Sequence, residues 1–270
     1  MSGQKPAINW DIHPAAIWRS KRQYLRPVSR IDTIRFADLL GVDQQKQKLV
    51  LNTRRYLQGL PANNVLLWGS RGTGKSSLIK ALLNEFFEQG LRLIEIDKDD
   101  LLDLPEIVDE IKDTSHRFIV FCDDLSFERG ESTYKALKSV LEGSIELPPE
   151  NILIYATSNR RHLLPEYMKD NEQAAIVGGE IHHAEAVEEQ ISLSDRFGLW
   201  LSFYPVNQPG YLEMIDQLFP EVTDRKELHL EAIRFATGKG VRSGRTAQQF
   251  YRMYSGDMSM PFYGVSGEGN

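Results

Sequence analysis

The sequence has little cysteine and no long hydrophobic run, and each absence excludes a class of protein. Cys122 is the only cysteine among 270 residues, so no internal disulfide can form. No apolar run approaches the roughly 20 residues that a helix needs to span a bilayer. Near the N-terminus, Lys5, Asp11 and His13 interrupt the apolar stretch that a secretory signal requires. We therefore expect neither a disulfide-stabilised secreted domain nor a protein held in a membrane.

The chain also lacks a basic net charge. It contains 32 Lys and Arg residues against 38 Asp and Glu residues, which gives a formal net charge of −6 at pH 7. Such a chain has no overall attraction for nucleic acid or for an anionic membrane, although a local patch can attract either. The apolar fraction of 41% is ordinary for a globular protein, and the length suffices for one large domain or two modest ones. A sizeable hydrophobic core is therefore expected.

The most informative stretch is residues 65–77, where an apolar segment leads into the pattern G-x-x-x-x-G-K-S and then into helical spacing. Glycines at this spacing let backbone N–H groups wrap a polyphosphate, and a helix that begins near Lys75 directs its positive end at the phosphates. We expect Lys75 to reach the β- and γ-phosphates of a bound nucleotide and Ser76 to take one position on Mg²⁺. The predicted phosphate-binding loop, or P-loop, comprises Gly69, Ser70, Arg71, Gly72, Thr73, Gly74, Lys75, Ser76 and Ser77.

Polar residues follow two further apolar segments, as expected where the strands of a parallel sheet end. Residues 118–122 are apolar and lead into Asp123 and Asp124, and residues 152–156 lead toward Asn159. Ligands bind beyond the carboxyl ends of such strands. We expect Asp123 to bind Mg²⁺, Asp124 to orient the attacking water, and Asn159 to lie near the γ-phosphate. The alternative roles are helix caps for the two carboxylates and a turn for the asparagine.

Residues 1–31 are predicted to form a basic N-terminal arm rather than part of a folded domain. Within this segment, residues 18–30 contain five basic residues, no acidic residue and two aromatic residues, Trp18 and Tyr24. Such a segment can neutralise and stack on single-stranded nucleic acid. We favour the alternative, in which the aromatic rings pack on the domain and the charges are solvated or pair with its acidic surface.

Residues 32–206 are predicted to form an α/β nucleotide-binding core around a five-stranded parallel sheet. Residues 160–190 are polar and acidic, so a loop is expected there. The adjacent His182 and His183 within it would point to opposite sides of an extended chain, and no Cys or third His lies nearby, so we do not expect a metal site. The strands are predicted at residues 65–69, 91–96, 118–122, 151–159 and 199–204.

Residues 207–254 are predicted to form a small helical lid. The periodicity indicates helices at 211–219, 228–237 and 246–254. Residues 255–270 are rich in Gly and Ser and are expected to form a flexible tail.

Taken in order, these motifs resemble those of the AAA+ ATPases. More narrowly, residues 32–254 are similar to a largely uncharacterised bacterial family of predicted AAA+ ATP-binding proteins. The P-loop is common to NTPases in general, and the Ser-Leu-Ser-Asp-Arg-Phe-Gly-Leu stretch is what narrows the resemblance to this family. The matching stretches are residues 60–69, 72–77, 192–199 and 243–247.

The resemblance implies roles for three of the polar residues. Asn159 would be the sensor on the fourth strand, and Arg245 would be the lid residue that senses the γ-phosphate. Arg196 would be an arginine finger that reaches the nucleotide of a neighbouring subunit, so that turnover depends on assembly. Residues 36–42 would line the adenine pocket. From their residue types alone, Arg196 and Arg245 could instead form surface salt bridges.

The implied function is that of a cytoplasmic, oligomeric ATPase that hydrolyses ATP to ADP and phosphate with Mg²⁺ and couples motion of core and lid to a macromolecular partner. The family usually has Glu after the Mg²⁺-binding aspartate, whereas Asp124 is shorter by one methylene group, which predicts slower turnover. This difference leaves open a nucleotide-controlled loader or binding module that holds a partner protein or single-stranded nucleic acid. A small-molecule phosphotransferase is a third alternative, which Arg196 and Arg245 disfavour.

Overall fold

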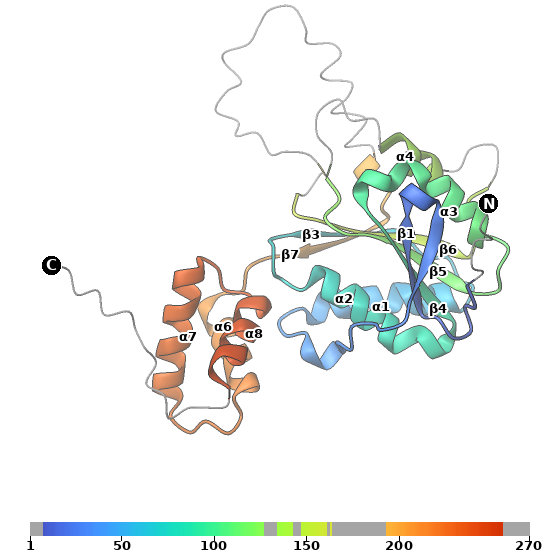
Figure 1. The fold of residues 1–270 in the computed structure, drawn as a ribbon. Helices are drawn as coiled ribbons and strands as arrows, with labels where there is room; N and C mark the ends of the chain where they lie inside the picture. Colours follow the sequence, from blue (N-terminus) through green and yellow to red (C-terminus); the bar gives the residue numbers. More distant parts are fainter. Residues whose placement is uncertain (1–7, 127–133, 143–146, 161–162, 164–192, 256–270) are drawn as a thin grey trace, which may run out of the picture.

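The structure is a computed structural model that describes residues 8–126, 134–142, 147–160, 163 and 193–255. An α/β body built on a twisted sheet lies beside a smaller, wholly helical body (Figure 1). His182, His183 and most of the predicted loop at 160–190 lie outside the described residues. The same holds for the predicted C-terminal tail, apart from Ser255.

In the described part of the chain, the sheet contains seven strands in the order β2-β1-β4-β5-β6-β3-β7. Neighbouring strands run parallel except β1 and β2, which form an antiparallel hairpin. The five predicted strands are present and parallel, as β3 to β7, but the predicted number of strands was wrong, because β1 and β2 come from the segment predicted to be an arm. The strands are β1 (Ala15–Arg19), β2 (Tyr24–Val28), β3 (Val65–Gly69), β4 (Leu91–Ile96), β5 (Arg117–Cys122), β6 (Ile152–Ser158) and β7 (Leu199–Phe203).

The β1–β2 hairpin is part of the hydrophobic core and not a separate arm. Trp18 is 3% exposed, and its indole Nε1 donates a hydrogen bond to Asp103 Oδ2 at 2.9 Å. Successive side chains of a strand point to opposite faces, so the exposed Arg19 can follow the buried Trp18. The basic residues dominate the composition of this segment and conceal its short apolar strands. The alternative in which the aromatic rings pack on the domain is confirmed for Trp18.

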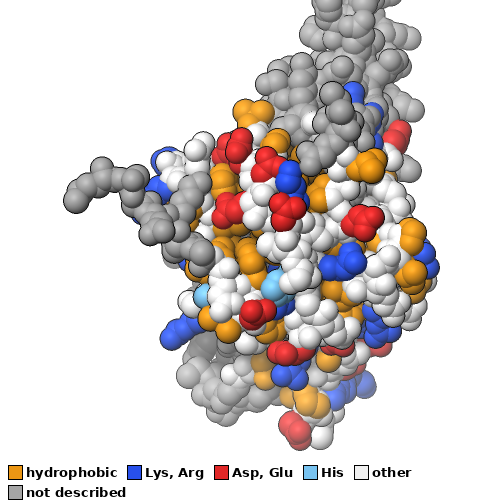
Figure 2. Space-filling model, turned by 90° about the vertical axis from the view of Figure 1, so that its right-hand side faces the viewer, with side chains coloured by type: hydrophobic (Ala, Val, Ile, Leu, Met, Phe, Trp, Pro, Cys, Tyr) orange, Lys and Arg blue, Asp and Glu red, His pale blue; other side chains and the backbone are white. Residues whose placement is uncertain are grey.

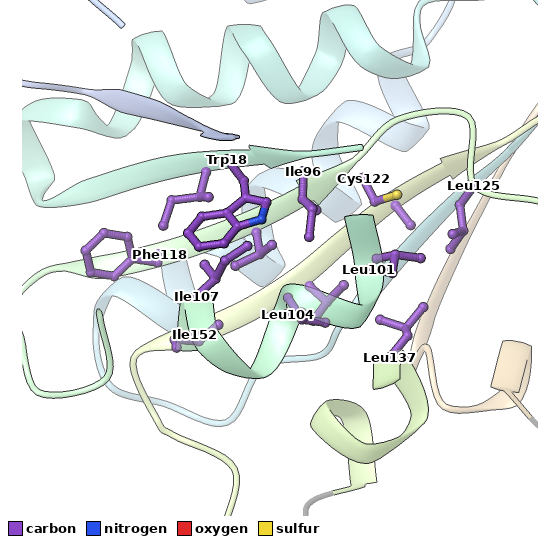
Figure 3. Close-up of a cluster of buried hydrophobic side chains, with 14 of the residues drawn as sticks. Trp18, Ile96, Leu101, Leu104, Ile107, Phe118, Cys122, Leu125, Leu137 and Ile152 are labelled. Carbon is purple, nitrogen blue, oxygen red and sulfur yellow. The ribbon is translucent and has the colours of Figure 1, made fainter. Parts of the chain in front are cut away.

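Helices cover both faces of the parallel part of the sheet. On one face, Leu49 of α1 and Leu82 of α2 are fully buried against the strands. On the other face, Ile107 of α3 and Leu137 of α4 pack over the sheet together with Trp18 (Figure 3). Strands covered on both faces are apolar along their length, which is why β5 and β6 are recognisable in the sequence. These helices are α1 (Asp43–Leu57), α2 (Lys75–Phe86), α3 (Leu104–Ile111) and α4 (Tyr134–Glu142).

The helices that follow β7 form a small bundle with a core of its own. Tyr211, Ile215, Ala232 and Phe250 are buried in this core. At the start of each helix, a polar side chain accepts a hydrogen bond from a backbone N–H group, which stabilises that end. None of the helices that the structure describes is both long and apolar enough to cross a membrane. The bundle consists of α6 (Gln208–Leu218), α7 (Arg225–Lys239) and α8 (Gly244–Tyr254).

Candidate nucleotide-binding site

The P-loop connects the carboxyl end of β3 to the first residue of α2. Gly69 has φ +130°, and a Cβ atom here would lie 1.9 Å from the backbone oxygen of Phe203 in β7. Gly74 caps α2 in a left-handed conformation with φ +96°, which lets the helix begin at Lys75. The loop therefore packs closely on β7 and then turns, so that the N-terminus of α2 faces the space beyond the strands.

Lys75 is only 7% exposed, and oxygen atoms surround its ammonium group. Nζ donates to the backbone oxygens of Gly69 at 2.7 Å and Ser70 at 2.8 Å, and to Asn159 Oδ1 at 3.2 Å. Burial lowers the pKa of Lys75 to about 8, although nearby carboxylates oppose this shift. An anion that approaches Nζ favours the charged form, so the lysine is suited to receive a phosphate group.

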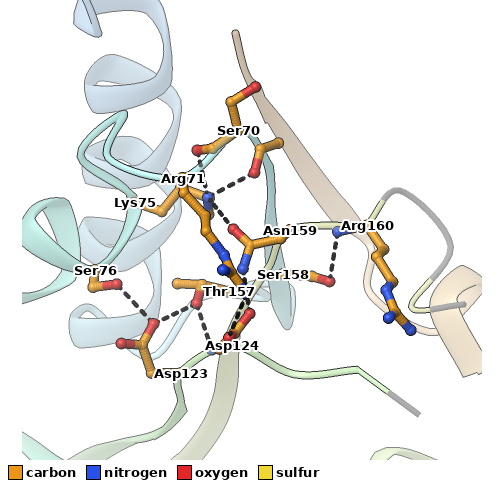
Figure 4. Close-up of polar contacts among 11 residues, drawn as sticks. Ser70, Arg71, Lys75, Ser76, Asp123, Asp124, Thr157, Ser158, Asn159 and Arg160 are labelled. Atoms are coloured by element: carbon orange, nitrogen blue, oxygen red, sulfur yellow. Dashed lines mark hydrogen bonds and ion pairs between the residues drawn. The ribbon is translucent and has the colours of Figure 1, made fainter. Parts of the chain in front are cut away.

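Ser76 in α2 and Asp123 after β5 are in direct contact, although 47 positions separate them in the chain. Ser76 Oγ donates a hydrogen bond to Asp123 Oδ1 at 2.7 Å (Figure 4). Carboxylate and hydroxyl oxygens are hard donors of the kind that Mg²⁺ prefers. Among the described residues, no group of three or more His, Cys, Asp or Glu side chains is arranged to hold a metal by itself. The pair therefore fits a Mg²⁺ ion that takes its remaining ligands from a bound triphosphate and water.

The carboxylate of Asp124 lies at the same edge of the sheet, between two side chains. Asn159 Nδ2 donates a hydrogen bond to Asp124 Oδ1, and Arg71 Nη2 lies 3.8 Å from Asp124 Oδ2. Asp124 has φ +54°, a left-handed conformation that Asp adopts more readily than most residues. The turn after β5 thus directs this carboxylate toward the P-loop (Figure 4).

Thr157 of β6 belongs to the same network, and the sequence interpretation missed it. Its Oγ1 donates to Asp123 Oδ1 and accepts a hydrogen bond from the backbone N–H of Asp124 at 2.9 Å. Alternate residues of a strand share a face, so Thr157 lies on the side of β6 that also presents Asn159. That spacing of two residues is the signal that could have identified it.

A cleft of about 1060 Å³ extends from the P-loop to the helical bundle. The first turn of α8 touches the loop, because the backbone N–H of Arg245 donates to the oxygen of Gly72 at 3.4 Å. One face of α8 borders the cleft, since positions three, four and seven residues apart lie along one side of a helix. The side chains on this face are Arg245, Gln248, Gln249 and Arg252.

Apolar side chains also border the cleft, and these suit a nucleotide base. Of the segment 36–42, which was predicted to line an adenine pocket, Asp38, Leu39, Leu40 and Val42 border the cleft. Phe36 instead packs against the buried residues under α2. Met214 and Leu218 of α6 complete the apolar wall.

Arg196 is the one predicted catalytic residue that lies apart from the cleft. Leu199 pairs with Val65 at the amino end of β3, whereas the P-loop leaves from the carboxyl end of the same strand. Arg196 precedes Leu199, so it lies near the amino ends of the strands, whereas the P-loop lies at their carboxyl ends. Arg196 does not border the cleft. The predicted catalytic and Mg²⁺-binding residues that border the cleft together are Lys75, Ser76, Asp123, Asp124, Asn159 and Arg245. Of the predicted P-loop residues, all but Gly69 and Ser70 border it as well.

A helical bundle whose last helix touches the P-loop, joined to a parallel sheet with helices on both faces, is the architecture of the AAA+ class of P-loop NTPases. This chain has that fold. It belongs to the family described as "Protein of unknown function (DUF815)", whose family model matches residues 11–258. No curated protein matches the chain in sequence.

Solved structures of the same fold include the RuvB Holliday junction branch migration motor of Thermotoga maritima. That structure is 15% identical, with a TM-score of 0.52, over 81% of this chain and 63% of its own length. A point mutant of the same RuvB gives 17% identity and a TM-score of 0.52 over 81% and 63% of the two chains. A second mutant is 16% identical, with a TM-score of 0.54, over 82% of this chain and 65% of its own length. This chain therefore spans less than two thirds of these proteins, and the likeness shows a shared fold alone.

Proposed function

We propose that the chain is an ATPase that binds ATP with Mg²⁺ and hydrolyses it to ADP and phosphate. The observation that carries this proposal is the 2.7 Å contact between Ser76 Oγ and Asp123 Oδ1, next to the buried ammonium group of Lys75. A cation and a pair of Mg²⁺ donors at the end of a P-loop suit one magnesium triphosphate. The backbone N–H groups of residues 69–77 would wrap its phosphates.

The chemistry of each side chain assigns its role in this proposal. Lys75 neutralises charge on the β- and γ-phosphates, and Ser76 and Asp123 hold the Mg²⁺ ion. When bound, Mg²⁺ supplies further neutralisation of the phosphate oxygens. Asp124 orients the attacking water and accepts its proton. Asn159 bonds to both Lys75 and Asp124, so it keeps the base beside the site of the γ-phosphate.

The two arginines would link turnover to the lid and to assembly. Arg245 lies at the start of α8 against the P-loop, where it can contact the γ-phosphate and move the lid with it. Arg196 lies at the far edge of the sheet, so it would act on the nucleotide of a neighbouring subunit. We therefore propose a homo-oligomer with nucleotides at its interfaces, acting in the cytoplasm on a macromolecular client.

The proposal is tested by measuring ATP binding and phosphate release separately. Lys75→Ala should lose ATP binding, because a buried cation that faces the phosphates is removed. Asp124→Asn should bind ATP as the wild type does and release phosphate about 100-fold more slowly, since a general base is lost while the shape is kept. A wild-type protein that binds no ATP in the presence of Mg²⁺ contradicts the proposal.

A second candidate is a nucleotide-controlled binding module that turns ATP over very slowly. This candidate is favoured by the contacts that Asp124 makes with Arg71 and Asn159. Because its carboxylate oxygens already interact with these two side chains, they are less available to orient the attacking water. Such a module would hold a partner protein or single-stranded nucleic acid while ATP is bound. The branch migration motor of similar fold agrees with a nucleic-acid partner, but a shared fold does not select one.

The surface gives this second candidate one place to test for nucleic acid. Acidic and basic side chains are interspersed on the face shown in Figure 2, so this face carries no continuous basic surface. The turn of the β1–β2 hairpin exposes Arg19, Lys21 and Arg22. Alanine at all three positions should abolish salt-sensitive oligonucleotide binding if the module uses nucleic acid. Deletion of residues 1–31 is unsuitable, because it removes two strands from the sheet.

A further inference from the structure

The turn that carries both carboxylates is fastened to a single residue of β6. The last aligned pair of β5 and β6 is Cys122 and Ala156, and the chain then leaves the regular ladder. The next two backbone N–H groups that bond to β6 both reach Thr157. The N–H of Asp124 donates to Thr157 Oγ1 at 2.9 Å, and the N–H of Leu125 donates to the Thr157 backbone oxygen at 2.7 Å.

The Thr157 hydroxyl acts in this turn both as a donor and as an acceptor. A threonine hydroxyl has one proton to donate and lone pairs to accept. Here the proton goes to Asp123 Oδ1, and a lone pair accepts the N–H of Asp124. Thr157 is 1% exposed, so bulk water cannot take over either bond. The same hydroxyl therefore sets the direction of one carboxylate and the backbone position of the next.

We infer that Thr157 is a positioning residue, which orients Asp123 to bind Mg²⁺ and holds the left-handed turn that presents Asp124. The inference rests on the nucleotide site proposed above and adds a residue to it. Ser76 also donates to Asp123 Oδ1, but the Ser76 oxygen is itself a proposed metal ligand. Thr157 is the second donor to that oxygen, and side chains that orient a metal ligand in this way commonly affect metal affinity 10- to 100-fold.

Two substitutions of Thr157 separate the effect of its hydroxyl from the effect of its packing. Thr157→Val keeps the volume and branching of the side chain and removes the hydroxyl, whereas Thr157→Ser keeps the hydroxyl. Thr53→Val is the matched control, because Thr53 is also buried, with 0% exposure. Its hydroxyl bonds to the Tyr155 hydroxyl at 2.9 Å, and it does not border the cleft.

The first experiment titrates Mg²⁺ against the binding of a fluorescent ATP analogue. Thr157→Val should raise the Mg²⁺ concentration for half-maximal effect by about 10-fold or more, with unchanged binding in EDTA. Thr157→Ser and Thr53→Val should follow the wild type. Equal Mg²⁺ dependence in Thr157→Val and Thr53→Val overturns the inference. A wild type that shows no Mg²⁺-dependent binding instead overturns the proposed function and takes the inference with it.

The second experiment needs no nucleotide. In Thr157→Val, hydrogen exchange at the Asp124 amide should accelerate at least 10-fold over the wild type, because its acceptor is gone, while amides within β5 keep their rates. Unchanged exchange at Asp124 overturns the inference even if Mg²⁺ binding differs. If Thr157→Val does not fold, Thr157→Ala replaces it in both measurements, since it also removes the hydroxyl and adds no bulk.

Discussion

Single residues of this site owe their chemistry to their surroundings, and Lys75 shows this most directly. A lysine in water has a pKa of 10.5, and burial under the P-loop lowers that of Lys75 to about 8. Three oxygen acceptors hold the ammonium group without supplying a full negative charge at hydrogen-bond distance. The residue can gain stabilisation from a phosphate group that the free protein does not supply.

ATP affinity is predicted to fall as the pH rises through about 8. Phosphates favour the charged ammonium group, so the pKa of Lys75 is higher in the complex than in the free protein, where it is about 8. Above pH 8, binding therefore takes up a proton, and affinity falls by up to about tenfold per pH unit; below pH 7 the lysine is already charged and the dependence vanishes. Calorimetry in two buffers of different ionisation enthalpy measures this uptake. Its absence at pH 9 would contradict the assignment, and Lys75→Arg serves as the control that stays charged.

Gly69 and Gly74 are predicted to differ in their tolerance of alanine, although both have positive φ. At Gly69 a Cβ atom meets the Phe203 oxygen at 1.9 Å, whereas at Gly74 nothing lies within 4 Å of it. Gly69→Ala should lower the free energy of unfolding by about 3 kcal/mol or more, from clash and strain together. Gly74→Ala should cost only about 1 kcal/mol of backbone strain. Denaturant titration compares them, and equal losses would show that the close approach to β7 does not limit this position.

At the scale of elements, the β1–β2 hairpin makes part of the first 31 residues belong to the sheet. β1 lies between β2 and β4 inside the sheet, and of the two hairpin strands β2 is the one at the edge of the sheet. Ala16, Trp18 and Leu25 join the same buried cluster as α3 and α4. The charged residues of the hairpin stay at its exposed side, and its apolar residues close the core.

Substitutions on the buried and the exposed side of the hairpin are predicted to change the free energy of unfolding by different amounts. Trp18→Ala should lower the free energy of unfolding by roughly 3–5 kcal/mol, because it empties a buried site and leaves Asp103 without its indole donor. The triple alanine variant at Arg19, Lys21 and Arg22 should change it by about 1 kcal/mol or less. Denaturant unfolding followed by circular dichroism measures both. If Trp18→Ala had only a small effect on the free energy of unfolding, the hairpin would not be part of the stabilising core.

For the whole molecule, the position of Arg196 bears on whether each nucleotide site of the proposed ATPase is built from one chain or from two. The cationic side chains that border the cleft of one chain include Lys75 in the P-loop and Arg245 on the lid, but not Arg196. In the proposed homo-oligomer, Arg196 would complete the phosphate site of another copy. Turnover by the proposed ATPase would then require assembly.

Mixing two inactive variants tests this arrangement. Lys75→Ala and Arg196→Ala should each lack turnover, and a mixture of the two should regain part of it. The recovery is expected because a Lys75→Ala subunit can still supply Arg196 to the intact P-loop of an Arg196→Ala neighbour. A mixture of Lys75→Ala with Arg245→Ala should stay inactive, since both residues serve the same chain's cleft. Steady phosphate release measures each mixture, and recovery in neither or in both would contradict the proposed division of roles.

Much of the fold is predictable from the sequence where apolar strands are covered on both faces. β3 to β7 were all expected close to their observed places, and β5 and β6 most clearly, because they are buried parallel strands and apolar along most of their length. β1 and β2 were not, since four basic residues lie among the few apolar positions of residues 15–28. The lid helices begin two or three residues before the predicted starts, each directly after a capping residue such as Asn207 or Ser243.

The sequence by itself determined the P-loop, because the glycines, the lysine and the serine that make it are neighbours in the chain and their spacing sets the local backbone. Only the tertiary structure decided what those residues meet. Ser76 reaches Asp123 across 47 positions, and Lys75 reaches Asn159 across 84. The role of Thr157, the burial that shifts Lys75, and the place of Arg196 outside its own cleft all depend on strand order, which no short stretch of sequence encodes.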